Sequence, residues 1–441
     1  MQTGTNRGSQ ICKQMNMEVG KLKEYGEYSF PYSENLAILA EPVTIAGGKM
    51  ELLNRMGVHP MEASDCDLDG SPTEWTWARY RRFFSSGAGL VWFEALPVQL
   101  DGRSNAHAAY LHEGNVDAYK RMISTLKEEN PGVKCVAQLT HSGRVSKPAG
   151  TPEPVISMWN PHYNARVNVA ADHELVDDDY LDRLVERFGV AAKLCEEAGF
   201  DAMDIKACSG YLYSELLCAR TRAGKYGGSL ENRARAFIDS IKAVKASVSS
   251  NITLASRYGF VENMPWPWSF GMDQENQHEW NLEEPLKVLD WMVEAGVELV
   301  NPTVGKVTVN YDFCNWNPED VQKDNGLYYF DKFCRGDRAL QQAHPEIAVI
   351  GADYAALHED APYVAAGALE QGDVTLAGFG RLAVAYPKFA HDIIEGNYDP
   401  KHCCIECGSC SKLLATQHPS GCVTRDPDTF LPLFKEFVQK K

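Results

Sequence analysis

The sequence lacks the long apolar runs and the basic character that several protein classes require. No stretch approaches the roughly 20 apolar residues of a membrane-spanning helix, and the polar segment 1–28 has no signal-peptide core. Only 43 lysines and arginines face 60 aspartates and glutamates, which gives a net charge of -17. This imbalance argues against nucleic acid or an anionic membrane as a partner. We therefore expect a cytoplasmic protein with a large buried core.

A dinucleotide-binding fingerprint is also missing. No G-x-G-x-x-G follows an apolar run, and the string Gly378-Phe379-Gly380-Arg381 lacks the third glycine. The short stretch after Cys422 leaves no room for such a domain within this sequence. Electrons for any redox chemistry are then expected from NAD(P)H that docks directly at the site, or from a separate electron-donor protein.

Cysteine, in contrast, is abundant and unevenly placed. The 13 cysteines are an odd number, and most lie singly in apolar settings that are typical of reduced thiols rather than of a disulfide framework. Near the C-terminus a C-x2-C-x2-C-x11-C spacing is formed by Cys404, Cys407, Cys410 and Cys422. Such thiolates can enclose a structural zinc ion or an iron–sulfur cluster, and the spacing leaves both open. Cys403 competes with Cys404 as the first ligand, and the even spacing favours Cys404.

From about residue 36, short apolar runs alternate with amphipathic segments. The clearest amphipathic segment has apolar residues three to four apart, begins after the acidic Asp177–Asp179 and ends near Gly199, which predicts a helix. The apolar runs number eight: Met56–Met61, Leu90–Leu96, Val133–Leu139, Ala202–Ile205, Ile252–Ala255, Val297–Val300, Ile347–Ile350 and Val374–Ala377.

Eight strand–helix units predict an α/β fold of the TIM (β/α)8 barrel type, with a doubly wound open sheet as the alternative. We expect an irregular N-terminal extension over residues 1–35, the barrel over 36–400, and a Cys-rich segment with the C-terminal tail over 401–441.

The loops that follow the predicted strands hold the unusual residues, and this is where a barrel places its chemistry. The fifth run is followed by a loop that contains Trp266 and Trp268 between prolines. These rings either form a satellite hydrophobic cluster or line a flat substrate. Gly351 and Gly380 follow the last two runs, where barrels bind phosphate through backbone N–H groups.

Several of these strand ends resemble one family. The strings are His59-Pro60-Met61-Glu62, Gln138-Leu139-Thr140-His141-Ser142-Gly143-Arg144, Gly199-Phe200-Asp201-Ala202-Met203-Asp204-Ile205-Lys206, Gly210-Tyr211-Leu212, Lys225-Tyr226-Gly227-Gly228-Ser229-Leu230-Glu231-Asn232-Arg233 and Gly378-Phe379-Gly380-Arg381. From about residue 36 to 424 the chain resembles the Old Yellow Enzyme-like NADH:flavin oxidoreductases. The Cys cluster after the barrel resembles their iron–sulfur branch, which includes 2,4-dienoyl-CoA reductase, enoate reductases and trimethylamine dehydrogenase.

The resemblance implies FMN in the barrel and a [4Fe-4S] cluster, rather than zinc, on the four cysteines. Gln138 would meet the flavin pyrimidine edge with its amide, Arg257 would place a positive charge near N1, and Arg381 would bind the phosphate. The cofactor-binding residues that the resemblance implies are Pro60, Met61, Glu62, Ala95, Gln138, Arg257, Gly351, Ala352, Gly380 and Arg381.

Tyr211 matches the proton donor of the family. Reduction of an activated C=C bond needs a hydride on one carbon and a proton on the other, and a phenol with a pKa near ~10 keeps its proton at neutral pH. The chain departs from the family pattern at Lys206 and Ser209, which stand where many members carry a pair of imidazole or amide side chains. Glu62 replaces a smaller residue near flavin N5. His141 is a further candidate for substrate contact.

Three functions follow from these observations. The first is an ene-reductase that acts on an α,β-unsaturated carbonyl compound, such as an enoate, a dienoyl thioester, or a steroid or flavonoid enone. The second is an amine or N-methyl dehydrogenase that passes electrons out through the cluster, for which Trp266 and Trp268 could form a cation cage. The third is an electron-transfer flavoprotein subunit. A homo-oligomer is compatible with each function.

Overall fold

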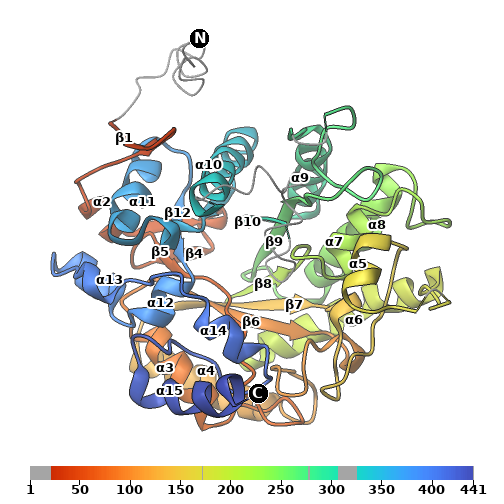
Figure 1. The fold of residues 1–441 in the computed structure, drawn as a ribbon, viewed down its shortest axis with the longest axis horizontal. Helices are drawn as coiled ribbons and strands as arrows, with labels where there is room; N and C mark the ends of the chain where they lie inside the picture. Colours follow the sequence, from red (N-terminus) through yellow and green to blue (C-terminus); the bar gives the residue numbers. More distant parts are fainter. Residues whose placement is uncertain (1–20, 171, 277–278, 306–324, 441) are drawn as a thin grey trace.

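The computed structural model describes residues 21–170, 172–276, 279–305 and 325–440, and its centre is a closed barrel (Figure 1). Each barrel strand pairs in parallel with its neighbours, and the last strand pairs with the first. The strands are β5 (Met56–Val58), β6 (Leu90–Pro97), β7 (Lys134–Thr140), β8 (Ala202–Ile205), β9 (Thr253–Val261), β10 (Leu299–Val304), β11 (Ala348–Gly351) and β12 (Leu376–Phe379). The predicted TIM barrel is therefore confirmed, and the open sheet is excluded.

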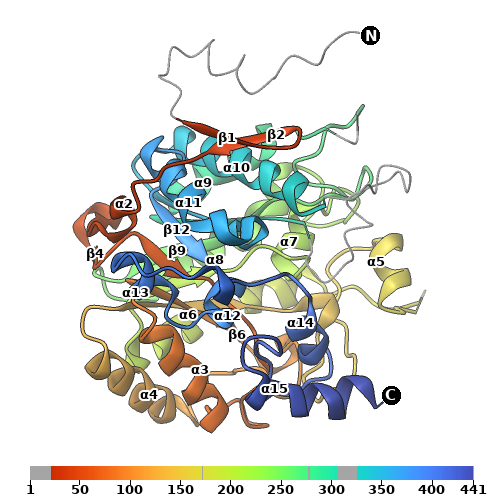
Figure 2. The same ribbon diagram turned by 60° about the vertical axis from the view of Figure 1, so that its left-hand side comes forward.

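Helices surround the barrel (Figures 1 and 2). The longest, α6, is the predicted one: the Asp177 side chain caps its first turn, and Gly199 ends it with a φ of 96° that favours glycine. The helices are α2 (Ala37–Ala40), α3 (Glu74–Phe84), α4 (Val116–Glu129), α5 (Pro161–Arg166), α6 (Asp178–Ala198), α7 (Leu212–Leu217), α8 (Leu230–Ser247), α9 (Glu283–Ala295), α10 (Asn325–Ala343), α11 (Ala361–Glu370), α12 (Arg381–Ala385), α13 (Phe389–Ile394), α14 (Ser409–Leu414) and α15 (Pro427–Phe434).

The barrel interior is apolar at the amino ends of its strands. Alternate residues of a strand point to opposite sides, so Leu90 and Trp92 face the interior, whereas Val91 and Phe93 pack against the outer helices. A hairpin of β3 (Val43–Ile45) and β4 (Met50–Leu52) packs against the interior cluster. This apolar base leaves the carboxyl ends of the strands for polar chemistry.

One strand is longer than the sequence pattern suggested. The fifth run was expected to end at Ala255, but β9 continues to Val261 because its pairing with β10 extends to Val304. Arg257 therefore lies within the strand rather than at its end. The Trp-containing loop begins at Glu262.

The N-terminal extension is not wholly irregular. Within the described residues of 1–35, β1 (Leu22–Tyr25) and β2 (Tyr28–Pro31) form an antiparallel hairpin that lies over α10 and α11 (Figure 2). Phe30 anchors it, because its ring meets the edge of Phe330 with a centroid distance of 4.7 Å. Residues 1–20 lie outside the described residues. The alternation of apolar residues in this short hairpin was too brief to predict it.

The Cys-rich C-terminal segment packs on α3 with a small apolar core of its own (Figure 2). Phe430 contacts Trp75 at a centroid distance of 6.0 Å, and Arg82 pairs with Asp426 at 2.6 Å. Across the described parts of the chain, none of the helices combines the length and apolar character needed to cross a membrane.

Candidate active site at the carboxyl end of the barrel

A polar layer lies above the apolar base of the barrel. Because side chains alternate along a strand, each residue two positions beyond an interior apolar residue also faces the interior. Thus Val136 is followed by Gln138, and Leu299 by Asn301. The same spacing produces Thr140 further along β7, and Asp204 and Arg257 on the next two strands, β8 and β9. The barrel therefore offers amide, guanidinium, carboxylate and hydroxyl groups on four adjacent strands.

Asp204 of β8 is hydrogen-bonded to three other strands, β6, β7 and β9. Its carboxylate accepts hydrogen bonds from the Trp92 indole at 2.8 Å, the Gln138 amide at 2.7 Å and the backbone N–H of Arg257 at 2.6 Å. Burial raises the pKa of Asp204, and these donors oppose that shift. Asp204 fixes the orientation of the Gln138 amide. Ala95 lies beside Gln138, since the two residues are paired in the register of β6 and β7.

His59 lies between the first and last strands of the barrel. Its Nε2 is 3.2 Å from the carbonyl of Gly351, and its Nδ1 is 3.0 Å from the Asn301 amide nitrogen. Burial, with the positive charge of Arg257, lowers the pKa of His59 to about 3. A Cβ at Gly378 would lie 2.1 Å from the His59 ring, so only glycine fits there. His59 is therefore a neutral ring that fixes the loop in which Pro60, Met61 and Glu62 follow.

Four side chains from three loops meet at the mouth of the barrel. The Tyr211 hydroxyl donates to one carboxylate oxygen of Glu62 at 2.7 Å, and the Ser104 hydroxyl donates to the other at 3.0 Å. Lys206 Nζ lies 3.7 Å from Glu62 and 4.0 Å from the centre of the Tyr211 ring. Burial, then the Glu62 charge, raises the pKa of Tyr211 well above its usual value. Tyr211 thus keeps its proton. We call Glu62, Ser104, Lys206 and Tyr211 the mouth cluster.

The other predicted substrate residues are engaged within the protein. His141 is buried, with Nε2 at 2.9 Å from the Tyr180 hydroxyl and Nδ1 accepting from the Gly143 N–H at 3.0 Å. Ser209 has a φ of 62°, and its hydroxyl lies 3.5 Å from the Cys208 thiol. Their roles toward a substrate stay predictions.

The two tryptophans of the loop after β9 are also in contact with protein groups. The Arg220 guanidinium lies 4.3 Å from the Trp266 ring centre. Trp268 packs against Tyr163 and Met264. This loop matches the satellite hydrophobic cluster that the sequence allowed, so a cation cage at these rings would have to share Trp266 with Arg220.

At the predicted phosphate site, the ends of β11 and β12 lie beside the loop that follows β5. A Cβ at Gly380 would lie 3.3 Å from Met61 Sδ, so the two loops are in close contact. Arg381 pairs with Glu406 at 2.5 Å and lies 3.7 Å from Asp353, which follows Ala352. The guanidinium of Arg381 thus links the barrel with the Cys-rich loop.

The residues of the polar layer fit a flavin. Within the described residues, the buried Thr140 hydroxyl and the side-chain amide oxygen of Asn301 have no hydrogen-bond partner. Together with the Gln138 amide and the Arg257 guanidinium, they offer donors and acceptors to a flat polar ring system. Arg381 offers a charge suited to a phosphate.

The four predicted cysteine ligands line one pocket, together with Arg381. The backbone N–H of Glu406 lies 3.4 Å from the Cys404 sulfur, and that of Arg425 lies 3.3 Å from the Cys422 sulfur. Hydrogen bonding with the hydroxyl groups of Thr424 and Ser409 lowers the pKa of Cys407. Such N–H and O–H donors stabilise thiolates, so the donor set suits a soft metal or a cluster. Cys403 faces away from this pocket, with its sulfur 2.8 Å from the Tyr398 hydroxyl.

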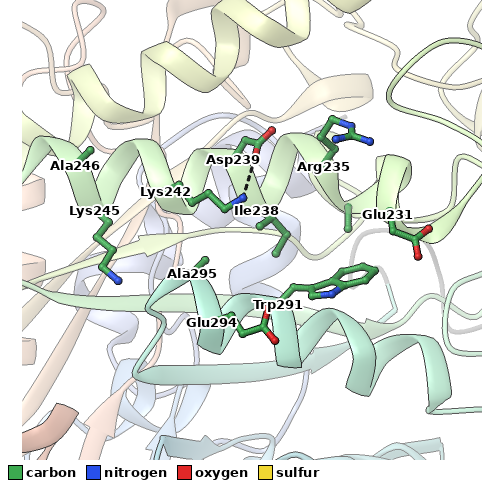
Figure 3. Close-up of a pocket in the computed structure, with 11 residues that line it drawn as sticks. Glu231, Arg235, Ile238, Asp239, Lys242, Lys245, Ala246, Trp291, Glu294 and Ala295 are labelled. Carbon is green, nitrogen blue, oxygen red and sulfur yellow. Dashed lines mark hydrogen bonds and ion pairs between the residues drawn. The ribbon is translucent and has the colours of Figure 1, made fainter.

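A larger groove lies on the outer wall of the barrel, between α8 and α9 (Figure 3). Trp291 and Glu294 of α9 and Arg235 and Asp239 of α8 are among the residues that line it. The residues that line it carry no predicted catalytic group, and the polar layer lies inside the barrel. The groove is therefore not the candidate site.

Sequence reasoning missed several residues of the site. Asp204 was visible as a lone charge within an apolar strand, which is a signal for a buried functional or positioning group. Asn301 directly follows an apolar run and could have been found in the same way. Ser104 carries no such signal, because only the fold brings its loop to Glu62.

The family of the chain follows from comparison with known proteins. The model of the NADH:flavin oxidoreductase / NADH oxidase family matches residues 39–399. A cinnamate reductase of Clostridium sporogenes is 25% identical over 391 residues, which are 84% of this chain and 54% of that protein. An NADPH dehydrogenase of a Geobacillus species is 30% identical over 212 residues, which are 47% of this chain and 59% of that protein. The chain thus spans little more than half the length of these two relatives.

Solved structures show the same fold. A 2-naphthoyl-CoA reductase superposes with a TM-score of 0.71 at 19% identity, over 91% of this chain and 58% of that chain. Histamine dehydrogenase from Rhizobium sp. 4-9 superposes with a TM-score of 0.68 at 20% identity, over 88% and 52%. The resemblance that the sequence motifs carried is confirmed: this chain is an oxidoreductase barrel that belongs to the NADH:flavin oxidoreductase / NADH oxidase family.

Proposed function

We propose that the chain reduces the C=C bond of an α,β-unsaturated carbonyl compound, with FMN in the barrel and a [4Fe-4S] cluster on Cys404, Cys407, Cys410 and Cys422. The observation that carries this proposal is the protonated Tyr211 hydroxyl in the mouth cluster, directly beyond the polar layer. A buried phenol that keeps its proton is a general acid for carbon. The name of the Clostridium relative, a cinnamate reductase, points to an enoate as the substrate class.

Different residues would bind the ring system and the phosphate of the flavin. FMN, when bound, supplies the hydride. Gln138, Arg257 and the backbone of Met61 and Ala95 would hold the ring system, and Arg381 with the Gly351–Ala352 and Gly380 backbone would hold the phosphate. Lys206 places a positive charge beside the carbonyl end of the substrate, where negative charge develops as the hydride arrives.

The proposal is tested by the anaerobic absorption spectrum of the purified protein, with flavin, iron and zinc analysis. We expect flavin bands with a broad iron–sulfur shoulder, bleaching on addition of NADPH or NADH, and reoxidation by cinnamate or a cyclic enone. Zinc in place of iron would reject the cluster. Flavin that no nucleotide bleaches, but that dithionite reduces and an enone reoxidises, would assign the reducing role to a protein donor.

The amine dehydrogenase alternative is tested in the same sample. An amine substrate would bleach the flavin without any nucleotide, and the reduced flavin would then ignore enones. That pair of results would overturn the ene-reductase proposal.

A further inference from the structure

The proton of Tyr211 points at a carboxylate rather than into open space. The Tyr211 hydroxyl donates to Glu62 at 2.7 Å, while Ser104 occupies the other carboxylate oxygen at 3.0 Å. Glu62 follows the first barrel strand and Tyr211 follows the fourth, so the contact depends on closure of the barrel. A proton donor whose hydrogen is already shared with an anion needs an account of how that hydrogen reaches a substrate.

Charge decides when Tyr211 can release its proton. A phenolate of Tyr211 beside an ionised Glu62 would place two negative charges within hydrogen-bond distance in a largely buried site, which is unfavourable. Lys206 lies 3.7 Å from Glu62 and 4.0 Å from the Tyr211 ring centre, so one positive charge faces both groups. The single positive charge of Lys206 balances one negative charge, on Glu62 or on Tyr211, but not both. Release of the Tyr211 proton is therefore favourable only when Glu62 itself carries a proton.

The Glu62 side chain can exchange that proton with water. It is 21% exposed, whereas Tyr211 is only 7% exposed. Glu62 is thus the more exposed member of the pair, and it contacts the phenol directly. This is the arrangement of a two-step proton path.

We propose that Glu62 is a positioning residue that orients Tyr211 and returns a proton to it in each turnover. This inference rests on the proposed C=C reduction. The O–H bond of Tyr211 breaks as a C–H bond forms on the substrate carbon, and the phenolate oxygen takes the proton of the Glu62 carboxyl group. The Glu62 carboxylate then regains a proton from water. The electron pair for the other carbon is the hydride that the flavin supplies.

Other charged and titratable groups lie near Glu62 and Tyr211 and contribute to the pH dependence of the rate. Lys206 faces it from the loop after β8, and the Cys208 thiol lies on the same loop. Arg79 of α3 donates to the carbonyl of Met61 at 3.0 Å, in the loop that carries Glu62. Arg79 also pairs with Asp65 and with Glu94 of β6, so these charges lie near the same loop. Each of these groups is unchanged in a Glu62→Gln variant.

The test compares wild type with Glu62→Gln in the flavin-loaded protein. The rate of reoxidation of the reduced flavin by an enone is measured from pH 5 to pH 9. We expect the wild-type rate to fall with rising pH by up to tenfold per pH unit, because a negative charge on Glu62 opposes release of the Tyr211 proton. The variant should show a flat profile, because a neutral amide cannot titrate. Superimposable profiles would overturn the proposal.

A second readout does not depend on turnover. The phenol of Tyr211 is titrated in the resting protein by ¹³Cζ-tyrosine NMR and assigned by the signal that Tyr211→Phe removes. Without the anionic acceptor, the pKa of Tyr211 should fall in Glu62→Gln, so the proton concentration at the midpoint should rise at least tenfold. An unchanged midpoint would contradict the contact with Glu62. The matched control is Asp392→Asn, which removes the carboxylate from the remote pair of Tyr386 and Asp392, whose distance is 2.6 Å.

Failure of the proposed function gives a different result. If no enone reoxidises the wild-type flavin at any pH, the C=C reduction is rejected whatever Glu62 does. The Tyr211 titration then still decides whether Glu62 controls this proton, because it needs no substrate.

Discussion

At the scale of single residues, burial decides which groups carry charge. His59 is buried near the charge of Arg257, and both of its ring nitrogens are engaged. It therefore stays neutral between about pH 3 and pH 6.5, the range in which a solvated histidine is mostly protonated. Tyr211 is buried beside Glu62, so it stays protonated. The size of neither pKa shift can be read from the residue type.

His59 makes the stability of the fold depend on pH. Its pKa is about 3 in the folded state, against about 6.5 when unfolded. Between these values the unfolded chain binds one proton more, so stability is lost as pH falls from about 6.5. We expect a loss of about 2 kcal/mol in the free energy of unfolding between pH 7 and pH 5, measured by urea denaturation.

A His59→Gln variant is the control for this prediction. Gln can still bond to the Gly351 carbonyl but does not titrate. The difference between wild type and variant should therefore shrink by about 2 kcal/mol from pH 7 to pH 5. A difference that stays constant with pH would assign the acid sensitivity to other groups.

Tyr211 is the proton donor in the proposed C=C reduction. In a Tyr211→Phe variant, we expect reoxidation of the flavin by an enone to slow about 10²- to 10⁴-fold, because the general acid is lost. Reduction of the flavin by NADPH should change little, since no proton of Tyr211 is used there. Stopped-flow measurement of the two half-reactions separates them, and equal loss in both would contradict the role.

At the scale of elements, a buried ion pair holds the short helix that carries Tyr211 at its N-terminus. Arg144 of the loop after β7 donates to Glu215 of α7 at 2.6 Å and 3.0 Å, and to the Met158 carbonyl at 2.8 Å. Both side chains of the pair are fully buried. The pair therefore fixes α7 against the third barrel strand, and with it Tyr211.

Breaking this pair should be costly. In Arg144→Met the carboxylate of Glu215 is left buried without its partner, so we expect a loss of about 3–5 kcal/mol in the free energy of unfolding. The double variant Arg144→Met, Glu215→Leu should recover much of it. The exposed pair of Lys242 and Asp239 on α8 is the matched control, for which Lys242→Met should cost at most about 1 kcal/mol. Similar costs for both pairs would refute this account.

Two neighbouring cysteines, Cys403 and Cys404, allow the proposed cluster ligands to be tested. Cys404 lines the pocket with three other cysteines, whereas the neighbouring Cys403 is buried against Tyr398. We expect Cys404→Ala to lose most of the bound iron and the iron–sulfur absorbance, and Cys403→Ala to keep both. Iron analysis of the purified variants decides between them, and the opposite pattern would make Cys403 the ligand.

At the scale of the whole molecule, the C-terminal segment forms a small unit on the surface of the barrel. Its apolar core is limited to Leu413, Val423, Phe430 and a few half-buried neighbours. Hydrogen bonds also tie it to the barrel: the Ser420 N–H donates to the Ala63 carbonyl at 3.0 Å, and the Gln417 amide donates to the Gly150 carbonyl at 2.8 Å. A core this small needs further support, which the proposed cluster on the four cysteines would supply.

Removal of the cluster should therefore loosen this segment alone. After anaerobic extraction of iron with a chelator, we expect faster amide hydrogen exchange in residues 404–426 and unchanged exchange in β6, β7 and β8. Hydrogen-exchange mass spectrometry measures both regions in one sample. Exchange that rises equally in the barrel strands would show that the segment and the barrel unfold as one unit.

The sequence by itself determined the architecture and much of the site. Eight apolar runs separated by amphipathic segments predict a barrel because each pattern reflects which side of an element is buried. The residues after those runs then fall at one end of the barrel, and the family resemblance of the motifs there allowed Glu62, Lys206, Tyr211 and Arg381 to be proposed without coordinates. The spacing of Cys404, Cys407 and Cys410 likewise predicts that these three lie close together, whereas Cys422 comes from further along the chain.

Only the tertiary structure decided how these residues meet. The hydrogen bond between Glu62 and Tyr211, the engagement of His141 by Tyr180 and the position of Arg257 within β9 depend on contacts between segments that are distant in the chain. Periodicity reports which face of a strand is buried. It does not report which strands become neighbours, or how far their pairing extends, because those outcomes are set by the closure of the whole barrel.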